Sequence, residues 1–146
     1  MKVIIGADHA GYLLKETIKQ YLSQKDIPFS DIGTFKMDSV NYPEYAYKVS
    51  IAVANGEYDF GILICGTGIG MCITANKIKG IRAAQAYTTE QAKLSRLHND
   101  ANVLCLGGRL LTEEEAAKIV DIWLNTSFEG GRHITRLNLI SQLTGL

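Results

Sequence analysis

The chain has 146 residues, of which 47% are apolar, and its 15 lysine and arginine residues balance its 15 aspartate and glutamate residues. This length and composition suit a single buried core, so we expect one domain spanning 1–146. The balanced charge argues against nucleic acid and anionic membrane surfaces as partners, and no apolar run is long enough to span a membrane.

Short apolar runs of strand length alternate with segments of helical periodicity along the chain. The runs lie at 3–6, 28–32, 59–65, 81–86 and 102–106. Apolar residues recur at helical spacing over 14–22, 46–53 and 116–124. Pro43 suits the first turn of a helix, and two capping boxes are predicted, Thr88 with Gln91 and Thr112 with Glu115.

This alternation predicts an α/β fold, a three-layer Rossmann-like sandwich around a five-stranded parallel sheet. We predict the strand order 2-1-3-4-5, which makes the first and third strands neighbours and places a ligand beyond their carboxyl ends. Asp8, His9 and Cys65 should meet there. A C-terminal helix within about 130–146 follows Gly130-Gly131, closes no further strand unit and could contact a partner subunit.

A glycine-rich loop follows the third predicted strand, where Cys65 is succeeded by Gly66, Thr67, Gly68, Ile69 and Gly70. Small residues let backbone N–H groups converge, and the next helix adds about half a positive charge, which predicts a site for a phosphate or an enolate oxygen. The dinucleotide fingerprint fails because its third glycine comes one residue early. No Lys-Ser/Thr pair completes a P-loop, and Met71 stands where a tyrosine-phosphatase loop needs arginine. The alternative is a loop that only needs small residues.

The three cysteines, Cys65, Cys72 and Cys105, fit neither a disulfide framework nor zinc-ligand spacing. Together with the lack of a signal-peptide pattern, this favours a cytoplasmic protein. Cys65 lies at a strand end just before a helix N-terminus, where a thiolate can act as a base or a nucleophile. We interpret Cys72 and Cys105 as small buried hydrophobic residues.

Several other polar residues are candidates, each with a structural alternative. Asp8 and His9 close the first predicted strand and could move protons, or Asp8 could only cap the following helix. His98, at the end of the fourth predicted helix, could be functional or only a partner of the helix dipole. The histidines lack the spacing of a metal site, so we expect acid–base chemistry without a metal.

Three arginines could bind a phosphate. Arg132 and Arg136 are four residues apart, so on a helix they share one face and could act as a clamp. Arg109 is the third candidate. A solvated helix face and a surface ion pair are the alternatives.

Taken together, these stretches resemble the type B ribose-5-phosphate isomerase family, which also includes galactose-6-phosphate and allose-6-phosphate isomerases. The resemblance runs along the whole chain. It is carried by Gly6 to Gly11, Asp38 to Tyr45, Ile64 to Gly70, Ala75 to Lys77, Gly80 to Ala83, Leu94 to Val103 and Glu129 to His133.

The resemblance implies an enzyme of the pentose phosphate pathway that interconverts ribose 5-phosphate and ribulose 5-phosphate through a cis-enediol, without a cofactor. It implies that Cys65 moves a proton between C1 and C2, that His98 assists ring opening and that Asp8 manages hydroxyl protons. Thr67 and the backbone of Gly66, Gly68, Ile69 and Gly70 would stabilise the enediolate. The other implied substrate-binding residues are His9, Tyr42, Asn99, Arg109, Arg132 and Arg136.

The resemblance also implies a homodimer or homotetramer whose active sites are shared between subunits. A hexose 6-phosphate, of allose or galactose, is the alternative substrate. From a different class, a receiver-like signalling module shares the architecture. That module needs an aspartate where this chain has Cys65 and a lysine where it has Gly107-Gly108.

Overall fold

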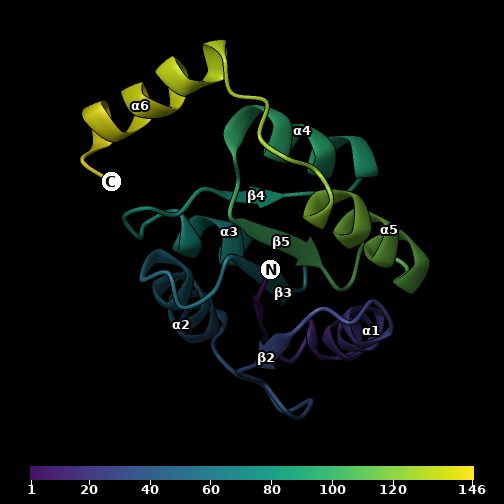
Figure 1. Cartoon of the computed structure of the whole chain (residues 1–146). Helices are drawn as coiled ribbons and strands as arrows, with labels where there is room; N and C mark the ends of the chain where they lie inside the picture. Colours follow the sequence, from purple (N-terminus) through teal and green to yellow (C-terminus); the bar gives the residue numbers. More distant parts are fainter.

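The computed structural model describes residues 1–146, and Figure 1 labels its helices and strands. The strands are β1 (Val3–Ala7), β2 (Phe29–Asp31), β3 (Phe60–Cys65), β4 (Ala83–Gln85) and β5 (Val103–Gly107). The helices are α1 (Tyr12–Gln24), α2 (Tyr42–Ala54), α3 (Ile69–Ala75), α4 (Thr89–Asn99), α5 (Glu113–Leu124) and α6 (Arg132–Thr144). The five predicted strands and the α/β class are confirmed.

The strands form one parallel sheet in the order β2-β1-β3-β5-β4. The predicted order 2-1-3-4-5 is therefore wrong in its last two positions. β5 is buried along its whole length, whereas β4 has only three residues, all half-buried. A continuous apolar strand gains more from the interior of a sheet, so β5 lies beside β3 and β4 forms the edge. The predicted pairing of β1 with β3 is confirmed.

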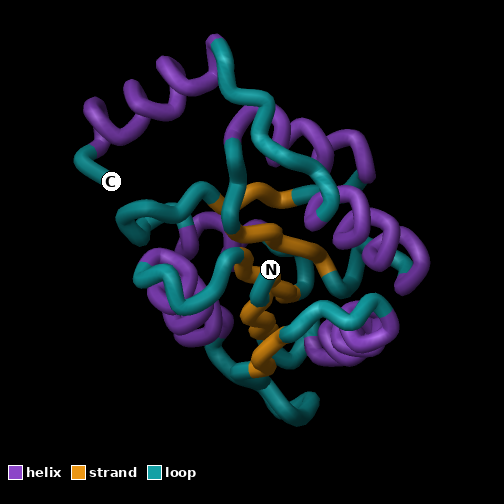
Figure 2. The backbone as a smooth tube through the Cα atoms, viewed as in Figure 1, coloured by secondary structure: helices purple, strands orange, loops and turns teal.

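Helices cover both faces of the sheet, as Figures 1 and 2 show. On one face, α1 and α5 bury Ile18 and Trp123 against the sheet, and the Trp123 indole donates to Ser95 of α4. On the other face, α2 and α3 bury Val49 and Met71. Both faces need helices because every parallel crossover returns over the sheet and the central strands are apolar on both sides.

The capping predictions are confirmed at one helix and half confirmed at another. Thr112 and Glu115 form a reciprocal capping box at the start of α5. At α4, Thr88 accepts a hydrogen bond from the backbone N–H of Gln91, as predicted. The side chain of Gln91 accepts from the backbone of Tyr87 instead of Thr88, so this box is incomplete.

The predicted C-terminal helix is α6, which extends away from the rest of the molecule (Figure 1). Its only buried residue is His133. Large apolar side chains are exposed along it, namely Ile134, Leu139, Ile140 and Leu143. An amphipathic helix of this kind finds no cover for its apolar face within its own chain. None of the helices combines the length and the apolar character needed to cross a membrane.

Candidate active site

The candidate residues fall into two groups at opposite edges of the sheet. The carboxyl-edge group follows strands β1, β3 and β5 or contacts the loop after β3, and it comprises Asp8, His9, Tyr42, Cys65 to Gly70 and Arg109. The amino-edge group lies at the end of α4, just before β5 begins, and on α6, and it comprises His98, Asn99, Arg132 and Arg136.

The sheet register gives the separation of the two groups. Cys65 pairs with Gly107 at the end of β5, whereas β5 begins at Val103. Four residues of parallel strand span about 13 Å. His98 precedes Val103 and lies at the far edge, so one copy of the chain does not bring Cys65 and His98 together.

Cys65 ends β3 at the start of the glycine loop. Its side chain is almost buried, and its Sγ accepts a hydrogen bond from the backbone N–H of Gly68 at 3.1 Å. Gly68 has a φ of +81°, which other residues rarely adopt. A donor in this position can stabilise negative charge on the sulfur during proton transfer.

The glycine loop also carries backbone N–H groups that are free to bind an anion. Those of Gly66, Thr67 and Gly70 make no hydrogen bond within the chain, whereas Gly68 donates to Cys65 and Ile69 to the Thr67 hydroxyl. The carbonyl of Thr67 accepts from the side chains of Gln85 and Tyr87, at 2.6 and 3.0 Å. Sequence reasoning missed these two residues, which hold the loop in place.

One oxygen of Asp8 holds the turn before α1, and the other is free. Its Oδ1 accepts hydrogen bonds from the backbone N–H groups of Ala10 and Gly11 at 2.9 and 3.0 Å, whereas the N-cap of α1 is Gly11 and no side chain caps this helix, so the capping alternative is wrong. Its Oδ2 makes no hydrogen bond within the chain. The backbone N–H of Asp8 donates to the carbonyl of Ile64 at 3.1 Å. Asp8, directly after β1, therefore lies next to the end of β3, where Cys65 is. The expected meeting of β1 and β3 at this edge is confirmed.

Three further side chains surround the loop. His9 accepts a hydrogen bond from Val40 at Nδ1, at 3.2 Å, so its neutral ring carries a proton on Nε2 that can be donated to a ligand. The ring of Tyr42 lies against Gly70, since a Cβ there would stand 2.5 Å from it. The guanidinium of Arg109 lies over Gly66 and forms no ion pair, which contradicts the ion-pair alternative.

The other two cysteines differ from each other. Cys105 is fully buried, and burial first, then Cys72, raises the pKa of its thiol well above the usual value. Cys72 is half-buried, and a hydrogen bond with Cys105, opposed by burial and helped by Gln85 and Asn76, lowers its pKa to about 7. Cys105 fits the predicted hydrophobic role, whereas Cys72 has thiolate character that the sequence did not indicate.

We predict that alkylation of Cys72 by iodoacetamide rises with pH around a midpoint near 7, because the thiolate reacts and a lowered pKa populates it as pH increases through that value. Mass spectrometry of peptides gives the rate at each cysteine. Cys105→Ala should move the Cys72 midpoint upward, since it removes the main stabilising donor. A Cys72 midpoint near 8.5, the ordinary value, would contradict the prediction.

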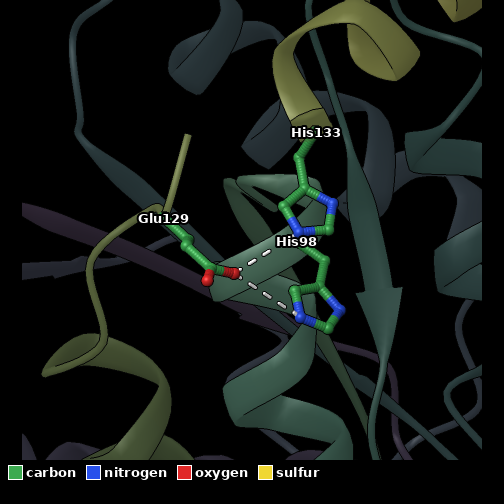
Figure 3. Close-up of side chains that lie close together, drawn as sticks. All are labelled: His98, Glu129 and His133. Atoms are coloured by element: carbon green, nitrogen blue, oxygen red, sulfur yellow. Dashed lines mark ion pairs between the residues drawn. The ribbon is translucent and has the colours of Figure 1, made fainter. Parts of the chain in front are cut away.

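The amino-edge group contains a close side-chain cluster that the sequence did not indicate. Figure 3 shows His98, Glu129 and His133 together. The two imidazole rings stack with centroids 4.4 Å apart, and Glu129 Oε2 lies 3.8 Å from His98 Nε2 and 3.3 Å from His133 Nε2. Glu129 and His133 are four residues apart, but the Gly130-Gly131 break interrupts the helical pattern that would have linked them.

The cluster has the composition of a zinc ligand set but not its geometry. Two imidazoles and a carboxylate within 4.8 Å of one another could in principle hold a metal ion. A ring nitrogen binds a metal in the plane of its ring, and here the two planes are only 17° apart. Two stacked, nearly parallel planes do not meet close to the rings, so one ion cannot lie in both planes at bonding distance, and the shared carboxylate is the better partner for both rings.

The arginines of α6 are available to an anion. Arg132 and Arg136 are both exposed, lie one turn apart as predicted and form no ion pair. Asn99 is exposed and lines a cavity together with residues of α6, and its backbone carbonyl accepts a hydrogen bond from Arg82 at 2.8 Å. A cavity of about 400 Å³ separates α6 from residues 80–84, and Leu137 and Ile140 line it. This cavity lies at the amino edge, away from Cys65.

Known proteins match the chain in sequence and in fold. The family model described as Ribose/Galactose Isomerase matches residues 3–140. A Listeria innocua protein named ribose-5-P isomerase B is 46% identical over 98% of this chain and 97% of its own. The structure of Clostridium thermocellum ribose-5-phosphate isomerase B has a TM-score of 0.98 and 48% identity, covering 99% of this chain and 98% of that one. Its Mycoplasma genitalium counterpart with bound ribulose-5-phosphate has a TM-score of 0.94 and 42% identity, covering 99% and 96%. The chain therefore belongs to the ribose/galactose isomerase family.

Proposed function

We propose that the protein is an aldose–ketose isomerase that interconverts ribose 5-phosphate and ribulose 5-phosphate. The observation that carries the proposal is the arrangement at the carboxyl edge, where the Cys65 thiol, free loop N–H groups and the free oxygen of Asp8 lie together. Isomerisation needs a base that serves two carbons, donors for an enediolate oxygen and a group that manages hydroxyl protons. Membership of the family and the pentose ligand of the Mycoplasma relative support this substrate class.

The reaction begins with ring opening, because ribose 5-phosphate is mainly a closed furanose. His98 donates a proton to the ring oxygen as the C1–O bond breaks. The free Oδ2 of Asp8 takes the proton of the C1 hydroxyl, which leaves an open-chain aldehyde.

Proton transfer between carbons follows. The thiolate of Cys65 removes the proton from C2, and the electron pair forms the C1=C2 bond of an enediolate. The free N–H groups of Thr67 and Gly70 stabilise the negative oxygen. Cys65 returns the proton to C1 while the C2 hydroxyl proton moves to the C1 oxygen, which gives the ketose. These steps need neither a metal nor a cofactor.

We propose a homodimer in which each active site joins the carboxyl-edge group of one copy to the amino-edge group of the other. The distance across the sheet supports this, because His98 cannot serve a substrate bound at Cys65 of its own chain. The exposed apolar residues of α6 support a second copy as the partner. Arg132 and Arg136 then share the phosphate with Arg109 of the other copy.

The organisation of the chain fits this role. We take 1–146 as one isomerase domain, since both core clusters pack on the same sheet. We place the enzyme in the cytoplasm, where a reducing environment keeps the base Cys65 and the other two cysteines as free thiols. Family membership leaves the receiver-like alternative without support.

The test is an assay of the purified protein in the presence of a chelator, with ribose 5-phosphate, allose 6-phosphate and galactose 6-phosphate compared at equal concentrations. We expect the highest kcat/KM with ribose 5-phosphate. A higher value for a hexose phosphate would replace the substrate while keeping the mechanism. No turnover of any of the three would refute the proposed function.

A further inference from the structure

The environment of His98 is more specific than general acid catalysis alone requires. Glu129 reaches both stacked rings from one side, and its Oε2 faces Nε2 of His98 and Nε2 of His133 (Figure 3). The other nitrogen of each ring, Nδ1, points away from the carboxylate (Figure 3). These contacts, at 3.8 and 3.3 Å, are ion-pair contacts, and the negative carboxylate attracts the positive N–H end of a ring, so it favours a proton on each Nε2.

The surrounding chain is built to hold this arrangement. The backbone N–H of Glu129 donates to Leu97 at 3.0 Å, which fixes the segment beside the last turn of α4. Gly130 and Gly131 have φ values of +72° and +58°, and this turn lets Glu129 and His133 face the same way. The side chain of His133 is buried, and its ring stacks on the ring of the more exposed His98, which restricts the orientation of His98.

The other charged groups nearby do not compete for these rings. On α4, Arg96 pairs with Asp100 at 2.8 Å, and Asp100 also binds Arg82 at 3.1 Å. On α6, Arg132 and Arg136 form no ion pair with Glu129. Glu129 is therefore the carboxylate that compensates charge on His98.

We propose that Glu129 is a positioning residue that holds the proton of His98 on Nε2, so that His98 meets the substrate through Nδ1. This inference rests on the proposed function and names the nitrogen that acts. In the protonated ring, Nδ1–H donates to the sugar ring oxygen as the C1–O bond breaks. The ring that remains is neutral and keeps its proton on Nε2, facing Glu129.

The test uses Glu129→Gln, which keeps the side-chain volume and removes the charge. An amide can accept or donate, so it no longer selects the Nε2–H form of His98. The matched control is Glu57→Gln, a change at an exposed glutamate whose side chain accepts a single hydrogen bond, from Asn55. We expect kcat from ribose 5-phosphate to fall by about tenfold or more, a part of the 10²–10⁴-fold that a general acid contributes. KM should stay within about twofold, and the control should match the native enzyme.

A second substrate separates positioning of the acid from support of the structure. Ribulose 5-phosphate cannot close a five-membered ring, because its C5 hydroxyl is esterified, so exchange of its C1 hydrogen in D₂O needs no ring-opening acid. Glu129→Gln should leave this exchange rate near the native value. If Glu129 only anchors α6, the exchange rate and kcat should fall together and KM should rise, since α6 carries Arg132 and Arg136. That result would overturn the inference.

A third readout does not depend on activity. In protein with ¹⁵N-labelled histidine, the ring nitrogen shifts should report the Nε2–H form of His98 in the native chain and a mixture in Glu129→Gln. A native Nδ1–H form would refute the inference. If the native protein turns over no sugar phosphate, the proposed function fails, while the ring spectra still decide the role of Glu129.

Discussion

Replacement of Cys65 by alanine is expected to lower kcat for ribose 5-phosphate by at least about 1,000-fold, within the range that a proton-transfer group contributes. The Cys65 thiol is the candidate base that accepts a hydrogen bond from the glycine loop, namely from the backbone N–H of Gly68. Alanine removes the base but leaves the backbone N–H groups of Thr67 and Gly70 in place. The variant should therefore still bind ribulose 5-phosphate, which isothermal titration calorimetry measures.

The matched control is Cys105→Ala. This residue is also a buried cysteine on a central strand. Its replacement should lower the free energy of unfolding by a similar amount, up to about 3 kcal/mol. Its kcat should stay near that of the native enzyme. Exchange of the C1 hydrogen of ribulose 5-phosphate should stop in Cys65→Ala and continue in Cys105→Ala. Continued exchange in Cys65→Ala would mean that another group is the base.

The carboxyl edge of the site could be predicted because it follows from local pattern. Asp8 and Cys65 each end an apolar run of strand length, and parallel strands bring such ends to one edge. The swap of β4 and β5 could not be predicted in this way. Both runs have strand length in the sequence, and the difference that decides their places, five buried residues in β5 against three half-buried residues in β4, emerges only in the assembled sheet.

The amino edge was harder to predict because it depends on the path of an irregular segment. His98 and His133 are far apart in the sequence, and residues 125–131 between α5 and α6 show no periodicity that would place them. The low pKa of Cys72 also depends on a contact between two elements, α3 and β5. Sequence patterns locate residues on elements, whereas contacts of this kind depend on how the elements pack.

A heterodimer of two inactive variants is expected to be active if each active site uses residues from two copies of the chain. Cys65→Ala lacks a working carboxyl-edge group, and His98→Asn lacks a working amino-edge group. In a heterodimer, one site combines the intact Cys65 of one chain with the intact His98 of the other. Co-expression with two different tags isolates this heterodimer, whose turnover should reach about half that of the native dimer, because one of two equivalent sites is complete.

The control pairs Cys65→Ala with Asp8→Asn. Both residues lie in the carboxyl-edge group, so each site of this heterodimer contains one damaged group and activity should stay as low as in the separate variants. The contrast between the two heterodimers is the measurement, since changes in folding would affect both alike. Equal recovery in both, or recovery in neither, would show that the two edges do not meet across a subunit interface. In that case His98 would need another role, because the width of the sheet separates it from Cys65 in its own chain.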